Sequence, residues 1–390
     1  MSGLGKSGKR LLVWQWGRRG AGPRFAAELA EAFERTGHEP VLSLSQRAES
    51  FAGLKSLCTR GYHIDAGGSL LGQARFGLGL PVTLSKLENF LRHESIDAAV
   101  CAMPGYWDRA VAAKLRRAGI PLVTIVHDWR AHAGDGHDLV YRLQRGVIRD
   151  SAAIVTLSDH VEQQLRGGSS EMSGLRHLRR LAHPPFAFSD LMLKSPVAWK
   201  PHGGPSNILI VGRIKAYKGV ETALAMMDHL SDVPVRLRIA GALGRPKWRV
   251  RAEAMNSVHL RPEWLSERDL VAEIDAADIV LFPYVAATQS GLIPLCQSRG
   301  RVVVVSPAGG IAEQVAAGRD GVVTEAATAR SLAGAVRNLV DDPAFCRRLA
   351  ENALADHVPE PEWSKLASGI VDLCNLVQRD VNLASKNQMQ

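Results

Sequence analysis

Short apolar runs alternate along the chain with segments in which apolar residues recur every three or four positions. The run Leu11–Trp16 predicts a strand, and after the glycine-rich turn Gly17–Pro23 the residues Phe25, Leu29 and Phe33 share one helical face. The same order recurs through the first half. It predicts strands at Val41–Leu44, Asp97–Ala102, Leu122–Val126 and Ala152–Leu157, and helices at Leu84–His93, Asp108–Ala118 and Val140–Arg149.

A second series of strands and helices follows a proline- and glycine-rich segment at about 184–206, which is typical of an interdomain linker. It comprises strands at Ile208–Val211, Val235–Ala240, Ile279–Phe282 and Val302–Val305, helices at Val220–His229, Ile293–Ser298 and Ile311–Ala316, and a mostly helical tail from Ala327. Strands that alternate with helices indicate parallel sheets covered on both faces.

We therefore predict an α/β protein with two doubly wound, Rossmann-like domains that face one another across a cleft. Ligands of such sheets bind at the carboxyl ends of the strands. The predicted divisions are a first domain at 1–190, a linker at 191–206, a second domain at 207–360, and a C-terminal helix and tail at 361–390 that can pack back on the first domain.

Composition excludes several classes of protein. Of 390 residues, 46% are hydrophobic and 22% charged, which is ordinary for a globular protein and excludes a disordered or collagen-like chain. No apolar run approaches the roughly 20 residues of a membrane-spanning helix, and a cleaved signal peptide is not expected. The five cysteines are scattered without paired spacing, which predicts buried free thiols.

The net charge of +9 comes entirely from the first half of the chain. Residues 1–200 hold 27 basic and 18 acidic residues, whereas residues 201–390 hold 21 of each. This asymmetry points to nucleic acid, an anionic membrane or an anionic substrate. The residues concerned form either a solvated surface or an interfacial patch, and include Arg18, Arg19, Arg24, Arg116, Arg117, Arg176, Arg179 and Arg180.

Two stretches of the second half carry candidate chemistry. In the first, a strand ends at Gly212-Arg213, and Lys218-Gly219 precede a helix, which places cations beside a helix N-terminus, as phosphate binding requires. In the second, Gln289-Ser290-Gly291 and Gly309-Gly310 follow strands and open helices. Glycines there let a diphosphate approach the backbone, although tight turns also use glycine.

These motifs resemble those of the family 4 retaining glycosyltransferases of group 1 type, which have the GT-B fold. The resemblance covers roughly 205–355 well, and the first half more loosely through Gly20–Gly22 and His127-Asp128. It implies transfer of a hexose-type sugar from a nucleotide diphosphate donor, such as a UDP- or GDP-sugar, to a glycan or lipid-linked acceptor in polysaccharide biosynthesis. It also implies a reaction with retention, without cofactor or metal, in a cytoplasmic enzyme that is peripheral on the membrane.

The resemblance also assigns roles to residues. Arg213 and Lys218 would hold and stabilise the leaving diphosphate, while Gly20, Gly22 and His127 would reach the donor sugar. Gly212, Gln289, Ser290, Gly291, Gly309 and Gly310 would bind the donor. The sequence departs from the family pattern at one point, because the two places where many members carry glutamate hold Ala287 and Leu295. The identity of the sugar, the identity of the nucleotide and the stereochemistry of the reaction therefore stay open.

Alternatives follow from the same residues. The missing glutamates are compatible with a GT-B sugar-nucleotide epimerase or a non-catalytic member, and the charge with a nucleic-acid-binding protein. Nucleic acid is the least expected partner because no zinc finger, basic helix or aromatic RNA-binding set is present. His132, Asp135 and His137 fit no standard zinc spacing. His183-Pro184 predicts a strand-end turn or a donor contact, and Asp341-Asp342 a helix cap.

Overall fold

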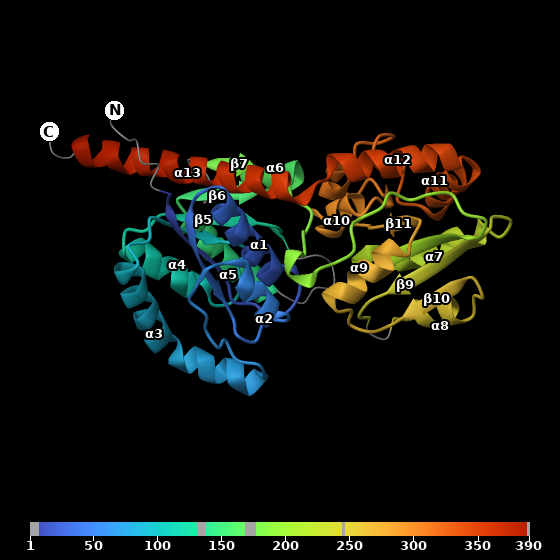
Figure 1. Cartoon of the computed structure of the whole chain (residues 1–390). Helices are drawn as coiled ribbons and strands as arrows, with labels where there is room; N and C mark the ends of the chain where they lie inside the picture. Colours follow the sequence, from blue (N-terminus) through green and yellow to red (C-terminus); the bar gives the residue numbers. More distant parts are fainter. Residues whose placement is uncertain (1–7, 131–137, 168–176, 244–245, 388–390) are drawn as a thin grey trace, which may run out of the picture. The chain divides into compact units, whose positions relative to one another are not determined.

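The computed structural model describes residues 8–130, 138–167, 177–243 and 246–387. They divide into two compact units (Figure 1). The first comprises the described residues of Met1–Ala131, His137–Asp190 and Glu360–Gln390, and the second those of Leu191–Pro359.

The first unit contains a parallel sheet of seven strands in the order β3-β2-β1-β4-β5-β6-β7. Its strands are β1 Arg10–Gln15, β2 Glu39–Leu44, β3 Arg60–Gly61, β4 Ala98–Cys101, β5 Leu122–Val126, β6 Ala153–Thr156 and β7 Leu178–Arg180. Its helices are α1 Ala21–Arg35, α2 Phe51–Leu54, α3 Leu70–His93, α4 Asp108–Arg117, α5 Asp138–Arg149, α6 Asp159–Arg166 and α13 Pro359–Asn387, with short 3₁₀ turns η1 Lys55–Leu57 and η3 Ser189–Leu191.

The second unit contains a parallel sheet of six strands in the order β10-β9-β8-β11-β12-β13. The strands are β8 Ser206–Val211, β9 Val235–Ala240, β10 Val258–Arg261, β11 Ile279–Phe282, β12 Val302–Val305 and β13 Gly321–Val323. The helices are α7 Val220–Asp228, α8 Trp248–Glu253, α9 Glu267–Asp275, α10 Leu292–Ser298, α11 Ala329–Asp341 and α12 Pro343–Asp356, with 3₁₀ turns η4 Ala216–Lys218 and η5 Gly309–Gln314.

The predicted fold class of two Rossmann-like parallel-sheet domains is confirmed. In each sheet the strand order reverses direction at one place, between β1 and β4 in the first unit and between β8 and β11 in the second. Such a switch point opens a crevice at the carboxyl ends of the strands, where doubly wound sheets bind ligands. The loops that follow β8 and β11 therefore lie where a ligand site is expected.

Two predicted helices differ from the structure. The helix predicted at Leu84–His93 begins at Leu70, despite its glycines and Pro81, because Phe76 and Leu80 pack against the core and the Ser69 side chain accepts a hydrogen bond from Gly72 N–H. The helix predicted at Ile311–Ala316 is instead the 3₁₀ turn η5, and Val315 after it has extended backbone.

In the C-terminal region a helix cap predicted from the sequence is present in the structure. Asp342 caps α12, its carboxylate accepting a hydrogen bond from Phe345 N–H at 2.9 Å, as predicted. The next helix, α13, begins at Pro359 and belongs to the first unit, where Trp363 Nε1 donates to the Pro185 carbonyl at 2.8 Å. All five cysteines are buried and free, as predicted.

Candidate functional site

The predicted phosphate-binding loop lies at the carboxyl end of β8. The strand ends at Val211, the chain turns at Gly212, and η4 brings the Lys218 side chain back beneath this turn. Lys218 Nζ donates hydrogen bonds to the Tyr284 hydroxyl at 2.7 Å and to the Val211 carbonyl at 3.3 Å. A Cβ on Gly212 would lie 3.5 Å from this nitrogen, so glycine leaves room beside the ammonium group.

Lys218 is a buried cation that two oxygen acceptors stabilise. Burial lowers its pKa to about 8, and the positive charge of Arg213 also acts in the lowering direction. At neutral pH the ammonium form therefore still predominates. Two like charges close together, one of them desolvated, form a site whose energy falls when an anion binds between them.

Arg213 completes this pair from the solvent side. Its side chain is exposed, and within the described part of the chain no hydrogen bond or ion pair holds its guanidinium. An arginine without a fixed partner can present its planar fork of donors to a phosphate group. The structure thus places Gly212, Arg213 and Lys218 together, as the sequence predicted.

Gly219 fixes the backbone that brings Lys218 to this position. It has a φ of 67° and is both the end of η4 and the residue before α7. A Cβ at this position would lie 1.8 Å from the Pro283 carbonyl oxygen. Glycine is required here for its left-handed conformation and for the close approach of the loop after β11.

The loop after β11 joins the same group of residues. Tyr284 lies just past the strand, its buried hydroxyl accepts from Lys218, and Ser290 hydrogen-bonds to it as well. Burial raises the pKa of Tyr284, so the phenol stays neutral. The Ser290 backbone is paired with the Gln314 side chain, with Ser290 N–H donating at 2.7 Å and Gln314 Nε2 donating back at 3.1 Å.

The predicted donor-binding glycines lie around this network. Gly291 precedes α10, and Gly309 begins η5. Gly310 N–H donates to the Ala287 carbonyl at 3.0 Å, which ties η5 to the loop after β11. Gln289 is half-buried in the same loop. All the second-unit residues predicted from sequence therefore lie on the loops at the carboxyl edge of one sheet.

Ala287 and Leu295 fill the places where many family members have glutamate. Both are buried, with exposed fractions of 4% and 1%. Leu295 belongs to α10. Neither side chain can accept a hydrogen bond, so neither can take the part that a glutamate would play in binding a donor.

Two residues of this network, Tyr284 and Gln314, were not predicted from the sequence. Tyr284 is the partner of Lys218, and Gln314 is the partner of Ser290. A weak signal existed for Tyr284, because it follows a buried strand by two positions and so lies at the carboxyl edge. Gln314 carries no such signal, since its role depends on how η5 packs against the loop after β11.

In the first unit, Gly20 and Gly22 lie at the start of α1, directly after β1 and its turn. Gly20 is exposed with a φ of 84° and precedes the helix. Gly22 is buried, and a Cβ on it would lie 2.9 Å from Gln15 Cδ. The Gln15 side chain in turn accepts a hydrogen bond from Gly17 N–H at 2.7 Å, which holds the turn in place.

His127 follows β5 and is buried among aromatic rings. Its Nε2 donates to the Ala102 carbonyl at 2.9 Å, and its ring centroid lies 4.9 Å from that of Phe25 and 6.0 Å from that of His183. Burial lowers the pKa of His127, and burial with the neighbouring His127 lowers that of His183 to about 3. Both imidazoles are therefore neutral at physiological pH.

Several basic residues of the first half are paired with carboxylates, and the interfacial patch stays a prediction. Arg24 is buried and pairs with Asp190, so its assignment to a surface was wrong. Others pair with carboxylates: Arg19 with Glu49, Arg116 with Asp150, Arg179 with Asp372 and Arg180 with Asp159. Arg176, His132, Asp135 and His137 lie outside the described residues.

The sheets and their carboxyl-edge loops define a protein of the GT-B fold class. Family models agree with this: "Glycosyl transferases group 1" matches residues 205–342, and "Glycosyl transferase 4-like domain" matches residues 20–171. The chain belongs to the family 4, group 1 type glycosyltransferases.

Curated relatives are similar to this chain over part of their length. Glycogen synthase of Mycobacterium tuberculosis is 27% identical over 265 residues, which cover 64% of this chain and 61% of that protein. The alpha-D-kanosaminyltransferase of Streptomyces kanamyceticus is 24% identical, over 65% of this chain and 69% of that protein. The matched region thus spans about 61% of the glycogen synthase.

Solved structures share the fold over almost the whole chain. A glycosyltransferase from Rickettsia africae has a TM-score of 0.70 at 12% identity, covering 95% of this chain and 99% of that one. Anabaena HepE in complex with UDP and glucose has a TM-score of 0.67 at 15% identity, covering 93% and 99%.

Proposed function

We propose that the protein transfers a hexose-type sugar from a UDP- or GDP-sugar to a hydroxyl group of a glycan or lipid-linked acceptor, in polysaccharide biosynthesis and without a metal ion. The observation that carries the proposal is the ammonium group of Lys218, which lies buried beneath Gly212 and beside the exposed Arg213. Family membership supports the reaction class.

The chemistry needs positive charge at this place. As the bond between the sugar and the diphosphate breaks, negative charge collects on the leaving diphosphate, and preorganised donors that face it lower the barrier. Lys218 is preorganised because Tyr284 and Val211 hold its nitrogen. In this proposal Arg213 contacts the diphosphate from the solvent side, and the two cations balance the negative charge that develops on it.

Further residues would bind the rest of the donor. The backbone N–H groups near Gly291, Gly309 and Gly310, together with Gln289 and Ser290, would hold the nucleotide. His127, Gly20 and Gly22 would contact the sugar, with His127 acting as a neutral hydrogen-bonding group rather than as a cation. The choice of a UDP- or GDP-sugar is supported by relatives, since HepE was solved with UDP-glucose and a GDP-mannose-dependent mannosyltransferase of Xanthomonas campestris is 32% identical over 104 residues.

A ligand panel tests the donor. The purified chain is heated with UDP, GDP and ADP and with their glucose or mannose derivatives, and saturation by one of them at 100 times its Kd should stabilise the fold by about 2.7 kcal/mol. Arg213→Ala should remove most of this shift. Arg251→Ala is the matched control, because Arg251 is another partly exposed arginine of the same unit that pairs with Asp228. If no nucleotide raises the unfolding temperature, the proposed donor class is wrong.

Product analysis then separates transfer from epimerisation and fixes the stereochemistry. The stabilising nucleotide sugar is incubated with and without a lipid-linked or oligosaccharide acceptor. Transfer releases the nucleoside diphosphate only when an acceptor is present, whereas an epimerase would convert the free nucleotide sugar on its own. We propose that the anomeric configuration is retained, and the coupling constant of the product's anomeric proton would show inversion if this is wrong.

We also propose that the enzyme associates peripherally with an anionic membrane through α3. Leu71, Leu78 and Val82 lie on one side of this helix with exposed fractions of 65%, 86% and 61%. Residues 75 and 86, at the same helical spacing, are the exposed cations Arg75 and Lys86. An exposed apolar stripe with basic neighbours is typical of helices that lie in the lipid headgroup region.

Charge on α3 favours an anionic lipid surface over a protein partner. The helix contains one acidic residue, Glu88, and this carboxylate accepts a hydrogen bond from Lys114 Nζ at 2.7 Å. The opposite side of the helix packs Leu84, Leu87 and Leu91 into the core, which attaches the C-terminal half of α3 to its unit. None of the helices in the described part of the chain has the length and apolar character needed to cross a bilayer.

Vesicle sedimentation tests this association. The full chain should sediment with vesicles of phosphatidylglycerol and phosphatidylcholine but not with phosphatidylcholine alone. Replacing Leu78 and Val82 by serine should lower the bound fraction at least several-fold, whereas Val250→Ser, which changes an exposed residue of the second unit, should leave it unchanged. Equal binding by all three proteins would exclude α3 as the contact.

A further inference from the structure

The strand β9 departs from the pattern of a sheet covered on both faces. Buried and exposed residues alternate along Val235–Ala240, and the exposed ones are Arg236 and Arg238. Parallel strands are normally apolar on both faces because helices cover both. On one face Leu237 and Ile239 pack into the core of the second unit. The other face of this part of the sheet is therefore not covered by an apolar layer.

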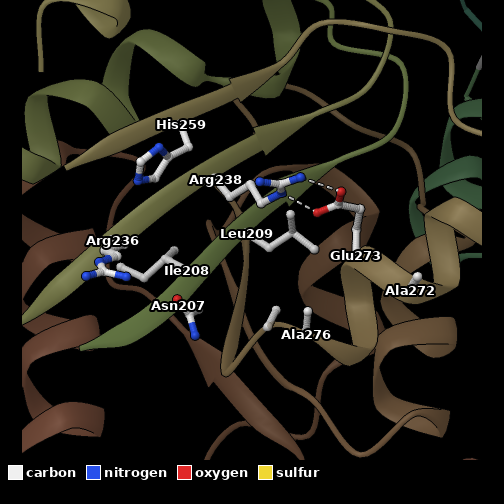
Figure 2. A pocket seen from close by; sticks show the side chains of 10 residues that line it. Asn207, Ile208, Leu209, Arg236, Arg238, His259, Ala272, Glu273 and Ala276 are labelled. Atoms are coloured by element: carbon white, nitrogen blue, oxygen red, sulfur yellow. Dashed lines mark hydrogen bonds and ion pairs between the residues drawn. The ribbon is translucent and has the colours of Figure 1, made fainter. Parts of the chain in front are cut away.

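A cavity of about 420 Å³ lies on this face of the sheet (Figure 2). In the strand register Asn207 is paired with Arg236, and Arg238 is paired with both Leu209 and His259. These five side chains line the cavity from the sheet. Since alternate residues of a strand project to the same face, three neighbouring strands present them as one surface.

The opposite wall comes from α9 and is mostly apolar. Ala272 and Ala276 line it together with Glu273. The cavity therefore combines a polar, basic side with an apolar side, and its volume lies within the roughly 300–1,000 Å³ of small-molecule sites. A site of this composition fits a small ligand that has an anionic group at one end and an uncharged body.

The charges around the cavity are only partly balanced. Glu273 accepts hydrogen bonds from Arg238, with Nη2 at 2.8 Å, and from Arg261 Nη1 at 2.9 Å. Arg261 has further carboxylate partners in Glu263 and Asp269. Among the residues that the structure describes, no carboxylate pairs with Arg236 or His259, and both side chains are exposed. Figure 2 shows the two projecting from neighbouring strands on the side away from Glu273.

We propose that this cavity binds a small phosphate monoester. Arg236 and His259 would hold the phosphate group, because a guanidinium fork and an imidazole N–H match its acceptor oxygens. The uncharged body would lie against Leu209 and Ala276. Asn207 and Arg236 are among the first two residues of their strands, whereas Arg213 and Lys218 follow a strand end, so this site is separate from the proposed donor site and does not depend on it.

Calorimetric titration with phenyl phosphate tests the proposal. The full chain carries Arg213→Ala throughout, so that the other basic site contributes little to phosphate binding, and phenol serves as the uncharged control ligand. Adding Arg236→Gln should lower the affinity for phenyl phosphate at least tenfold, and His259→Gln should lower it several-fold. Arg251→Gln, on a nearby helix of the same unit, should leave it unchanged.

Each outcome of the phenyl phosphate titration either supports or overturns the proposed site. Specific binding that Arg236→Gln and His259→Gln weaken, while the thermal unfolding midpoint stays that of the parent, supports the site. The proposal is overturned if phenyl phosphate does not bind, if phenol binds equally well, or if Arg251→Gln weakens binding as much as Arg236→Gln. The donor panel uses nucleotides and nucleotide sugars on the protein with Arg213 in place, so failure of the phenyl phosphate titration leaves the proposed glycosyl transfer intact.

Discussion

The two units each bury a basic side chain at the carboxyl edge of their sheet, yet the two side chains are held in different charge states. Lys218 in the second unit has two oxygen acceptors, the Tyr284 hydroxyl and the Val211 carbonyl, and keeps its proton at neutral pH. His127 in the first unit donates a hydrogen bond to the Ala102 carbonyl and is packed against the rings of Phe25 and His183.

The difference shows that burial alone does not set the charge of a group. Desolvation lowers the pKa in both places, but from different ordinary values. Lysine starts at 10.5, so the pKa of Lys218 stays above neutral at about 8, whereas histidine starts at 6.5, so any lowering leaves His127 neutral. One unit therefore supplies fixed positive charge and the other a neutral polar group.

The largest expected effect is on catalysis by the charged group. Lys218→Gln should lower kcat/KM by about 100-fold or more, because it removes charge that faces the leaving diphosphate. His127→Asn, which removes a neutral hydrogen-bonding group, should cost only about tenfold. Lys200→Gln, at an exposed lysine of the second unit, should have no effect. Equal losses for Lys218 and His127 would contradict the assignment of charge to one unit.

The second expected effect is on the stability of the fold, through Gly219 before α7 and Gly20 before α1. Gly219→Ala should destabilise the fold by about 3 kcal/mol or more, because its Cβ would lie 1.8 Å from the Pro283 carbonyl oxygen in addition to left-handed strain. Gly20→Ala should cost only about 1 kcal/mol, since a Cβ there meets no atom within 4 Å and strain is the sole cost. Urea denaturation measures both, and a larger loss for Gly20→Ala would show that the Pro283 contact can relax.

The third expected effect is on the pH dependence of ligand binding. In the proposed function the protonated form of Lys218 binds the diphosphate, and the pKa of Lys218 in the folded protein is about 8. Affinity for the nucleoside diphosphate should therefore be constant below pH 7 and fall above pH 8 by up to about tenfold per pH unit. Calorimetric titrations at pH 7, 8 and 9 measure this. A flat profile would mean that Lys218 does not contact the diphosphate as a cation.

The smallest expected effect is on the pH dependence of stability in the first unit. The pKa of His183 is lowered from 6.5 to about 3, so between these values the unfolded chain binds a proton that the folded chain does not. Stability from this group is present above pH 6.5 and is lost as the pH falls towards 3, by at most about 1.4 kcal/mol per pH unit. His183→Gln should show a shallower decline between pH 7 and 5 in urea denaturation. Identical slopes would show that His183 titrates normally.

Much of the second-unit site could be predicted because its signals are local. Gly212-Arg213 and Lys218-Gly219 stand at the end of an apolar run and the start of a helix, and the two glycine turns stand at equivalent places on neighbouring strands. Parallel strands end at one edge of a sheet, so recognising strand ends is enough to predict that these residues meet. The sequence also contains the alternation of apolar and basic residues in Val235–Ala240. The fold shows that its basic residues, Arg236 and Arg238, line a cavity beside the sheet.

The tertiary structure decided the rest because it brings together residues that are distant in the chain. Sequence alone does not pair Lys218 with Tyr284 or Ser290 with Gln314, nor does it place His183 beside His127. It placed Arg24 on a basic surface, whereas the structure buries Arg24 in an ion pair with Asp190. Strand and helix periodicity is a property of a few consecutive residues, whereas burial, ion pairing and the charge of a buried group depend on which distant segments exclude water from it.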